Sequence, residues 1–450
     1  MRPTVLAKVT VALVAAVLGT GLATVALRGG GSTHVASRST TTAAPTTTVA
    51  PPTTVTPATA APTTTSPQNA AQAQAIEQIR VQVSQLRQLP WKAPLDVRIV
   101  AKDEFVKRLE QAETRDEHAD RISGDSDALK VLQLIPRSVD FTKAFHDLLD
   151  AQVVGFYDPK TKQLLVRSTG SSLDGDTRVT MAHEMDHALT DQHFDFGTAT
   201  QRLDDADKVE QESAFTGLIE GDAVLLQTLF AQKYLTAKEQ AQLGGGGDSA
   251  VLRRTPKFIL DSLRFPYHDG LDFVLSRYRA GGGWQGVNDA YARPPVSTEQ
   301  ILHPDRYAAA EDWAPPPFPN LASATGCAPV RTSTLGEFGM AELLQEHTDE
   351  SSASQDATGW DGDLLSSVRC GQALGLADRW VADDDIGARR LASALTSWAG
   401  GWSGSNQAPG PDGRFSGPKG AGRLVLKGTT IDLVLADDGA TADRISAALG

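Results

Sequence analysis

The sequence is poor in cysteine and has no excess of basic residues, and each shortage excludes a class of site or partner. Only two cysteines occur among 450 residues, too few and too far apart for a cysteine-ligated zinc cluster. Lysine and arginine together number 42 against 55 aspartate and glutamate residues, which gives a net charge of -13. Because a nucleic-acid-binding protein needs a basic face, we expect no nucleic-acid partner.

The two cysteines, Cys327 and Cys370, both lie in the C-terminal half of the chain. In an oxidising compartment we expect them to pair and to close one loop of that half. Two free, buried thiols are the alternative.

The segment of residues 29–70 has almost no charge and almost no large apolar side chains. Threonine, alanine, proline and serine fill most of it. Such a segment cannot bury enough surface to offset the entropy that ordering would cost. We therefore expect a disordered Thr/Pro-rich linker, of a kind that is often O-glycosylated.

Residues 1–28 are expected to place the protein at a membrane. Arg2 and Lys8 come before a charge-free, mostly apolar run at residues 9–27, near the shortest length that spans a bilayer. Thr-Val-Ala at residues 24–26 is a poor cleavage site, which favours an uncleaved anchor over a signal peptide. We expect a single-pass protein of the cell membrane with its body outside the cytoplasm, or a secreted protein if the segment is cleaved.

The remaining sequence divides near residue 316, where a proline-rich stretch begins. Helical periodicity dominates residues 71–315, with a β-hairpin predicted at residues 153–167, where turn residues separate two apolar runs. Residues 316–450 combine helices with a strand pair at residues 423–435, and we assign no chemistry to this C-terminal region. The predicted fold class is α+β with helices dominant.

The helices predicted in the segment of residues 71–315 span residues 71–89, 104–111, 127–134, 140–149, 176–191, 205–231, 251–263, 270–279 and 284–292. Those at 251–263 and 270–279 are expected to be separate.

The segment His183-Glu184-Met185-Asp186-His187 is an HExxH motif. On a helix, residues four apart differ by about 40° in azimuth and about 6 Å in rise, so both histidines can reach one ion. Glu184 lies on the adjoining side, where it can act as general base towards a water at that ion. Zn2+ fits two imidazoles, a carboxylate and an open fourth position. A buried structural histidine pair is the alternative, although it is hard to satisfy without a cation.

Two residues compete to be the third ligand. His193 has a suitable spacing from His183, but that arrangement needs a glycine to turn the chain where this sequence has Thr190. If the helix simply continues, His193 is carried away from the ion. Glu220 is the better candidate, because it lies in an otherwise apolar helical stretch where an unpaired carboxylate is costly. Its neighbour Gly221 would let another helix approach closely, and a solvent-facing Glu220 is the alternative.

Around these residues the sequence resembles a family of predicted bacterial zinc metallopeptidases of the gluzincin type. The residues that carry the similarity are Ala-His-Glu-Met-Asp-His-Ala-Leu (182–189), Asp-Gln-His-Phe-Asp (191–195), Ile-Glu-Gly-Asp-Ala (219–223), Phe-Pro-Tyr (265–267), Gly-Gly-Trp (282–284), Ala-Tyr (290–291), Pro-Pro-Val-Ser-Thr-Glu-Gln-Ile-Leu-His-Pro (294–304) and Leu-Gly-Glu-Phe-Gly (335–339). The similarity covers about residues 153–398.

The resemblance implies a helix-rich zincin-like fold for residues 71–315, with a small β-hairpin or sheet beside the HExxH helix. It also implies His183, His187 and Glu220 as the ligands of Zn2+, and hydrolysis of peptide bonds in a peptide or protein substrate. The chain departs from the family at Val224, where many gluzincins carry an acidic residue that supports the site.

A gluzincin usually has a histidine or tyrosine that stabilises the oxyanion, and the resemblance implies one here. His303 is our candidate catalytic donor, in competition with Tyr267, Tyr291 and Tyr307. A packing or capping role for His303 is the alternative.

Two functions are consistent with these expectations. The first is an extracytoplasmic zinc metallopeptidase that hydrolyses peptide bonds with a water activated by Glu184. The alternative is a catalytically silent, zinc-stabilised binding or scaffold protein of the cell envelope. The intact Glu184 favours the first, because a site without turnover needs no base at that position.

Overall fold

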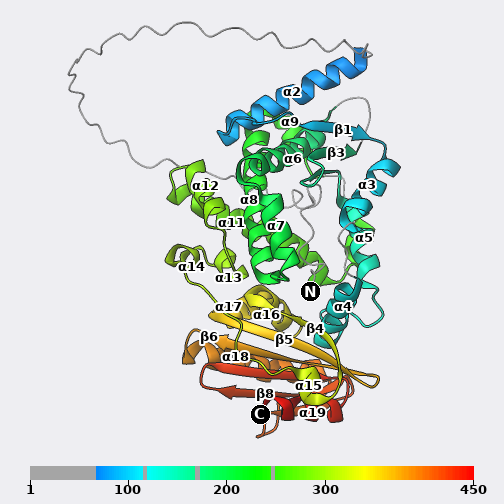
Figure 1. The fold of residues 1–450 in the computed structure, drawn as a ribbon, viewed down its shortest axis with the longest axis vertical. Helices are drawn as coiled ribbons and strands as arrows, with labels where there is room; N and C mark the ends of the chain where they lie inside the picture. Colours follow the sequence, from blue (N-terminus) through cyan, green and yellow to red (C-terminus); the bar gives the residue numbers. More distant parts are fainter. Residues whose placement is uncertain (1–66, 115–118, 168–172, 245–248) are drawn as a thin grey trace, which may run out of the picture.

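The structure is a computed structural model that describes residues 67–114, 119–167, 173–244 and 249–450. The predicted membrane segment and nearly all of the predicted linker lie outside the described residues. A helical body is followed by a C-terminal part built on a six-stranded sheet (Figure 1). The α+β class predicted from the sequence is therefore confirmed.

Helices and short strands alternate along the chain before the large sheet begins. The helical body contains α2 (Pro67–Arg87), β1 (Asp96–Val100), α3 (Lys102–Thr114), α4 (Ala119–Leu132), α5 (Phe141–Gln152), β2 (Gly155–Asp158), β3 (Gln163–Arg167), α6 (Gly175–Phe194), α7 (Phe196–Asp205), α8 (Val209–Tyr234), α9 (Ala237–Gln240), α10 (Ser249–Arg254), α11 (Lys257–Ala280), α12 (Trp284–Ala292), α13 (Thr298–Leu302) and α14 (Pro304–Ala309). The C-terminal part contains α15 (Leu321–Thr325), β4 (Ala328–Ser333), α16 (Gly336–Gln345), α17 (Glu350–Ala357), β5 (Trp360–Cys370), β6 (Ala373–Ala382), α18 (Asp385–Ser403), β7 (Arg414–Gly417), β8 (Gly420–Lys427), β9 (Thr430–Ala436) and α19 (Gly439–Leu449).

Helix α8 is the central helix of the body. Among the described residues it is the one helix long and apolar enough to cross a membrane by length and composition, but 94% of its apolar window is buried inside the protein. Its apolar character is therefore explained by its place in the core. The long helix predicted at about residues 205–231 is confirmed as α8, which begins a few residues later because Asp207 has a left-handed backbone with φ 56°, and α7 before it is absent from the prediction.

Helix α11 packs backbone to backbone against α8. A Cβ atom on Gly221 would lie 2.1 Å from the carbonyl oxygen of Gly270, and one on Gly270 would lie 2.2 Å from that of Gly217. The close approach expected at Gly221 is confirmed. The two separate helices predicted at residues 251–263 and 270–279 are wrong, because α11 runs on through Pro266. Buried packing on both sides of this proline outweighs the hydrogen bond that it removes.

The small sheet has the strand order β1-β3-β2, with β1 parallel and β2 antiparallel to β3. Strands β2 and β3 form the hairpin that the sequence predicts. A Cβ atom on Gly155 of β2 would lie 2.7 Å from Cγ2 of Thr180 on α6, so the strand presses directly on this helix. The sheet thus lies beside the helix that carries HExxH, as expected.

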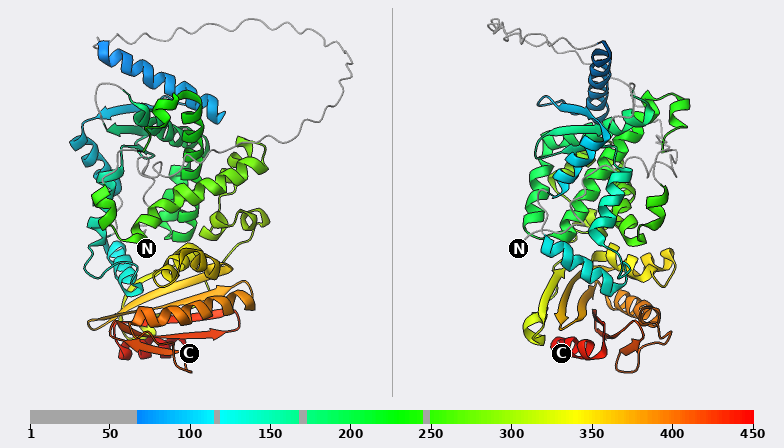
Figure 2. Two further views of the ribbon diagram at one scale, coloured as in Figure 1. Left: turned by 180° about the vertical axis from the view of Figure 1, so that it is seen from behind. Right: turned by 90° about the vertical axis from the view of Figure 1, so that its right-hand side faces the viewer.

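The C-terminal sheet has the order β4-β5-β6-β9-β8-β7, and all its neighbouring strands are antiparallel. Its two faces are both covered by helices (Figure 2). On β9, Leu433 and Leu435 join the core shared with α18, whereas Val434 and Ala436 join a smaller core with α19. The predicted strand pair corresponds to β8 and β9, and β4 to β7 are absent from the prediction.

Cys327 and Cys370 form a disulfide that joins the residue before β4 to the end of β5. The pairing expected from the sequence is confirmed.

One hydrophobic core crosses the boundary predicted near residue 316. It contains residues of α4, such as Leu132, together with residues of α18, such as Leu395 and Trp402. The indole Nε1–H of Trp402 also donates to the carbonyl oxygen of Val131 at 3.0 Å. The C-terminal part is therefore packed into the same body as the helices of residues 71–315.

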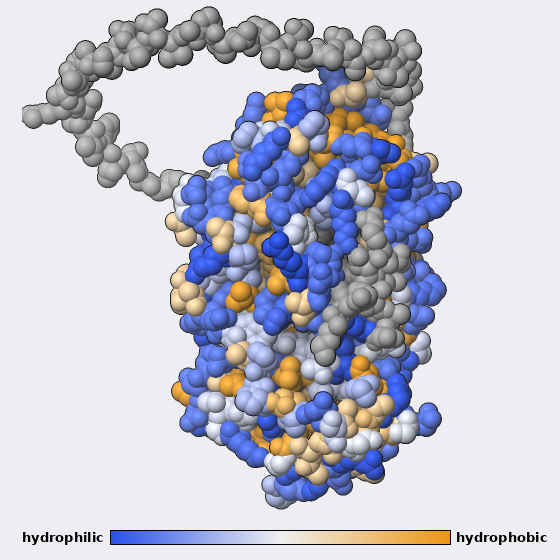
Figure 3. All heavy atoms as spheres, viewed as in Figure 1, coloured by the Kyte–Doolittle hydropathy of each residue, from blue (hydrophilic) through white to orange (hydrophobic). Residues whose placement is uncertain are grey.

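The face shown in Figure 3 is mainly polar, with apolar residues at several places, among them a group near the top of the view. Among the described residues the exposed large apolar side chains are Val81, Ile386 and Leu426, which belong to three separate elements.

Replacing Gly221 with alanine is expected to lower the free energy of unfolding by about 1–3 kcal/mol or more, because the new Cβ would force α8 and α11 apart. Denaturant unfolding measures the change. Gly439→Ala is the matched control, since a Cβ there meets nothing within 4 Å, and it should stay within about 0.5 kcal/mol of the wild type. A Gly221→Ala protein as stable as the wild type would contradict the close packing.

Candidate metal centre

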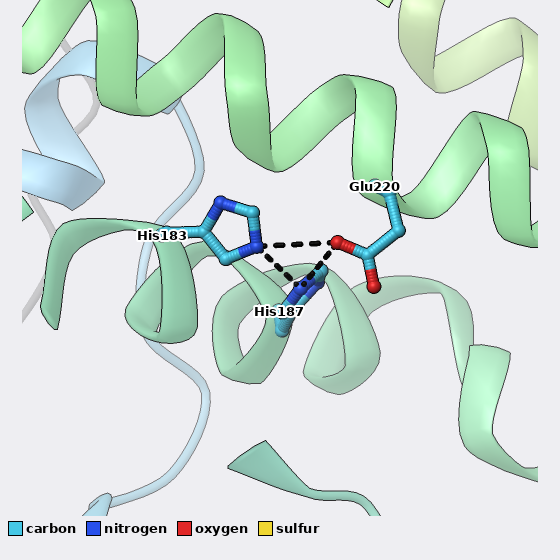
Figure 4. Close-up of side chains that lie close together, drawn as sticks. All are labelled: His183, His187 and Glu220. Atoms are coloured by element: carbon cyan, nitrogen blue, oxygen red, sulfur yellow. Dashed lines mark hydrogen bonds and ion pairs between the residues drawn. The ribbon is translucent and has the colours of Figure 1, made fainter. Parts of the chain in front are cut away.

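Helix α6 presents the HExxH motif from its buried middle. The Asp174 side chain caps its start by accepting from the backbone N–H of Thr177 at 2.9 Å. Asp195, with φ 51°, ends it in a left-handed conformation. The predicted helix at residues 176–191 is therefore confirmed and is slightly longer. His183 and His187 lie one turn apart and project towards α8 (Figure 4).

The structure brings His183, His187 and Glu220 together. The two Nε2 atoms of the histidines are 3.1 Å apart. Oε2 of Glu220 lies 3.2 Å from Nε2 of His183 and 3.4 Å from Nε2 of His187. Ligands at 2.0–2.1 Å from a tetrahedral ion are separated by about 3.3–3.4 Å, so the three donor atoms have the spacing of one coordination shell.

The charges at this point also fit a cation. All three residues are fully or almost fully buried, and Oε1 of Glu220 and Nδ1 of His187 have no hydrogen-bond partner among the described residues. Burial acts to raise the pKa of Glu220, but the adjacent His187 and His183 outweigh it and lower the pKa to about 2. A buried carboxylate held in its charged form needs a positive partner. The three residues can therefore bind a metal ion.

Gln227 orients the first histidine. Its amide oxygen lies 3.1 Å from Nδ1 of His183 and accepts the Nδ1–H. This tautomer leaves the Nε2 lone pair of His183 free to face a metal ion. Gln227 is absent from the sequence prediction, although it lies two turns after Glu220 in an apolar helix, and that spacing is the signal that could have found it.

Glu184 is held by the neighbouring strand. Its Oε2 accepts the backbone N–H of Tyr157 on β2 at 2.8 Å, while Oε1 has no partner among the described residues. The hydroxyl of Tyr157 donates to Asp191 at 2.7 Å, so β2 is joined to α6 at two points. Burial raises the pKa of Glu184 to about 8. The predicted general base thus has one fixed oxygen and one free oxygen.

Two aromatic rings lie beside the histidines. The ring of Tyr267 on α11 is nearly parallel to that of His183, with ring centroids 6.2 Å apart and an interplanar angle of 22°. Phe196 of α7 meets His187 edge to face at 6.1 Å. Both aromatic residues and the three donor residues are buried, so the triad has almost no contact with solvent in this structure.

The other predicted donors have different partners. His303 lies between α13 and α14, where its Nε2 pairs with Oε1 of Glu337 at 2.6 Å, and this contact raises the pKa of His303. Tyr307 donates its hydroxyl to the carbonyl oxygen of Arg293. Tyr291 stacks on Phe194. An oxyanion role for His303 stays a prediction, and Tyr267 is the competitor that the structure places against a ligand ring.

His193 lies outside the donor group. Its Nε2 donates to the carbonyl oxygen of Pro90 at 2.7 Å, near the protein surface.

Comparison with known proteins adds a finding for the C-terminal part. Residues 326–446 match the model of a family described as a domain of unknown function, DUF8575. No curated protein and no solved structure matches the chain. The matched segment runs from just before β4 into α19 and includes none of the three candidate ligands. The resemblance to gluzincins therefore stays a prediction from the motifs.

Replacing Gln227 with methionine is expected to weaken metal binding by about 10–100-fold, because His183 loses the acceptor that fixes its tautomer and orientation. Titration with Co2+ in competition with a chelator measures the affinity. Thr228→Val is the matched control, since the Thr228 hydroxyl bonds only to its own helix at Val224. Equal affinities of the Gln227→Met and Thr228→Val proteins would show that Gln227 has no such role.

Proposed function

We propose that the protein is a zinc-dependent peptidase in which His183, His187 and Glu220 hold Zn2+. The observation that carries this proposal is the triangle of three donor atoms with edges of 3.1, 3.2 and 3.4 Å. Among the described residues, no fourth histidine, cysteine or carboxylate joins the group. Structural zinc sites are usually closed by four protein ligands, whereas catalytic sites have three and an open position.

The residues around the triad suit hydrolysis. A bound zinc ion would supply a Lewis acid that polarises a peptide carbonyl and lowers the pKa of water. Burial alone raises the pKa of Glu184 to about 8, and a cation bound beside it would lower this pKa and favour the carboxylate. The carboxylate would keep Oε2 on the N–H of Tyr157, so Oε1 remains to take a proton from water and to pass it to the leaving amine. An oxyanion donor completes the set, and Tyr267 and His303 are the two candidates.

The substrate proposed is a peptide or protein segment in extended form. Strand β2 lies at one edge of the small sheet, and its Tyr157 N–H points to Glu184. A backbone laid along this edge would pass the general base. Since the triad and β2 are buried, side chains around them must move before such a segment can reach the site.

The same burial favours the alternative, a zinc-stabilised binding or scaffold protein of the cell envelope without turnover. His183, Glu184, His187 and Glu220 are each at most 1% exposed, as in a site that only holds the fold together. Catalysis remains the better proposal because Glu184 has a fixed position and a free oxygen, which a purely structural site does not need.

The disulfide of Cys327 and Cys370 supports a place outside the cytoplasm, since such bonds persist in oxidising compartments. We propose that residues 1–28 hold the folded body at the outer side of the cell membrane. We propose no nucleic-acid partner, because the net charge of the chain is -13.

Glu184→Gln is expected to retain about one zinc ion per chain, because the ligands are untouched, and to lose peptidase activity by about 10²–10⁴-fold. Zinc content by mass spectrometry and cleavage of a fluorogenic peptide library measure the two effects. Glu220→Gln should lose zinc and activity together, whereas Glu104→Gln, on the exposed face of α3, should change neither.

Three outcomes would count against the peptidase. Undiminished cleavage by Glu184→Gln would exclude the mechanism, and a wild-type protein without zinc would exclude the metal site. A zinc-loaded wild type that cleaves nothing in the library would favour the scaffold instead.

A further inference from the structure

Arg87, the last residue of α2, is fully buried against the two helices that carry the proposed ligands. Its Nη2 and Nε donate to Oδ2 of Asp222 on α8 at 2.9 and 3.3 Å. The same Nε lies 3.7 Å from Oδ1 of Asp186 on α6. One guanidinium therefore joins α6 to α8.

The two aspartates are sequence neighbours of the metal donors. Asp186 stands between the histidines of HExxH, and Asp222 comes two residues after Glu220. On a helix, a residue two positions on is rotated by about 200°, so Asp222 faces away from the side on which Glu220 meets the histidines. On α6, Asp186 is rotated by about 60° from His183 and about 100° from His187, so Arg87 joins the two helices beside the donor group and not within it.

The end of α2 is fixed by a second contact. The guanidinium of Arg87 lies over the ring of Trp284 on α12, with 4.4 Å to the ring centroid. The indole Nε1–H of Trp284 donates to the carbonyl oxygen of Leu86 at 2.6 Å. Directly afterwards the chain leaves the helix through Gln88, with φ 61°. The position of Arg87 is therefore set by α12 as well as by its carboxylate partners.

Removing the guanidinium would leave two carboxylates facing each other in a buried space without a positive charge. Asp186 and Asp222 would lose the group that joins them and would repel each other, so α6 and α8 would shift apart. A shift of a few tenths of an ångström matters here, because the donor atoms across the two helices are only 3.2 and 3.4 Å apart. The separation of these helices determines whether one ion can touch all three donors.

We propose that Arg87 is a positioning residue for the metal centre, which sets the spacing of α6 and α8 by bridging Asp186 and Asp222. Helix α2 then helps to position the metal ligands, although it lies far from HExxH in the sequence and follows the predicted linker. This inference rests on the metal site of the proposed function, but not on peptidase activity.

The test uses the full chain and Co2+ as the probe, because the visible absorption of Co2+ reports its coordination geometry. Arg87→Met is expected to weaken Co2+ binding by about 10–100-fold and to change the absorption spectrum of the bound ion. Arg87→Lys should restore part of the affinity, since it keeps the charge but cannot reach both aspartates in the same way.

Arg331→Met is the matched control. Arg331 is also a buried guanidinium that joins two aspartates, Asp125 at 2.6 Å and Asp207 at 2.8 Å, at the contact between α4 and β4. Its loss should lower the thermal stability of the protein and leave both the Co2+ affinity and the Co2+ spectrum unchanged. The control separates a positioning role from a general loss of stability.

The outcomes distinguish this inference from the proposed function. A wild type that binds no Co2+ would overturn the metal site itself. If Arg87→Met binds Co2+ with the affinity and absorption spectrum of the wild type, the proposed role of Arg87 is overturned, but the metal site is not. If Arg87→Met does not fold, Arg87→Lys takes its place, because it keeps a buried positive charge but cannot contact both aspartates in the same way. Wild-type Co2+ affinity and spectrum in Arg87→Lys would then overturn the inference. Altered Co2+ binding without any peptidase activity would support Arg87 and count against the peptidase.

Discussion

Helices α6 and α8 bury four carboxylates within one small volume, Glu184, Asp186, Glu220 and Asp222, and the surroundings are arranged to compensate them. Burial of an unpaired charge is far more costly than any single packing contact contributes. Glu220 faces two imidazoles, Asp222 and Asp186 face Arg87, and Glu184 accepts a backbone N–H from β2. The neighbouring elements α2 and β2 therefore each have an electrostatic reason for their position.

The parts of the site that depend on local spacing could be predicted from the sequence. HExxH needs only one helical turn, and Glu220 was recognisable as a charge within an apolar stretch. Arg87 could not be recognised from the sequence as part of the site, because its partner Asp222 lies 135 residues away and no local pattern links the two. The hairpin and the disulfide could also be predicted from the sequence. The length of α11 could not, because tertiary packing keeps the helix intact at Pro266, where the sequence favours a break. Strands β5 and β6 were missed because strands buried on both faces lack a simple alternation of polar and apolar residues. Strands β4 and β7 are short edge strands with few buried residues, which leaves them little apolar pattern.

The C-terminal part is joined to the start of the helix that carries Glu220. Arg331 of β4 pairs with Asp207, the residue that separates α7 from α8, and with Asp125 of α4. Together with the core that runs through Leu132 and Trp402, these contacts join the segment that matches DUF8575 to the helical body, at a distance from the three candidate ligands.

The burial of the triad has a consequence for how the proposed peptidase would behave. Donor atoms without access to solvent cannot reach a peptide bond, including one in a neighbouring copy of the chain. Turnover would then be limited by how often the surrounding side chains open a path to the triad, and the resting protein would be inactive.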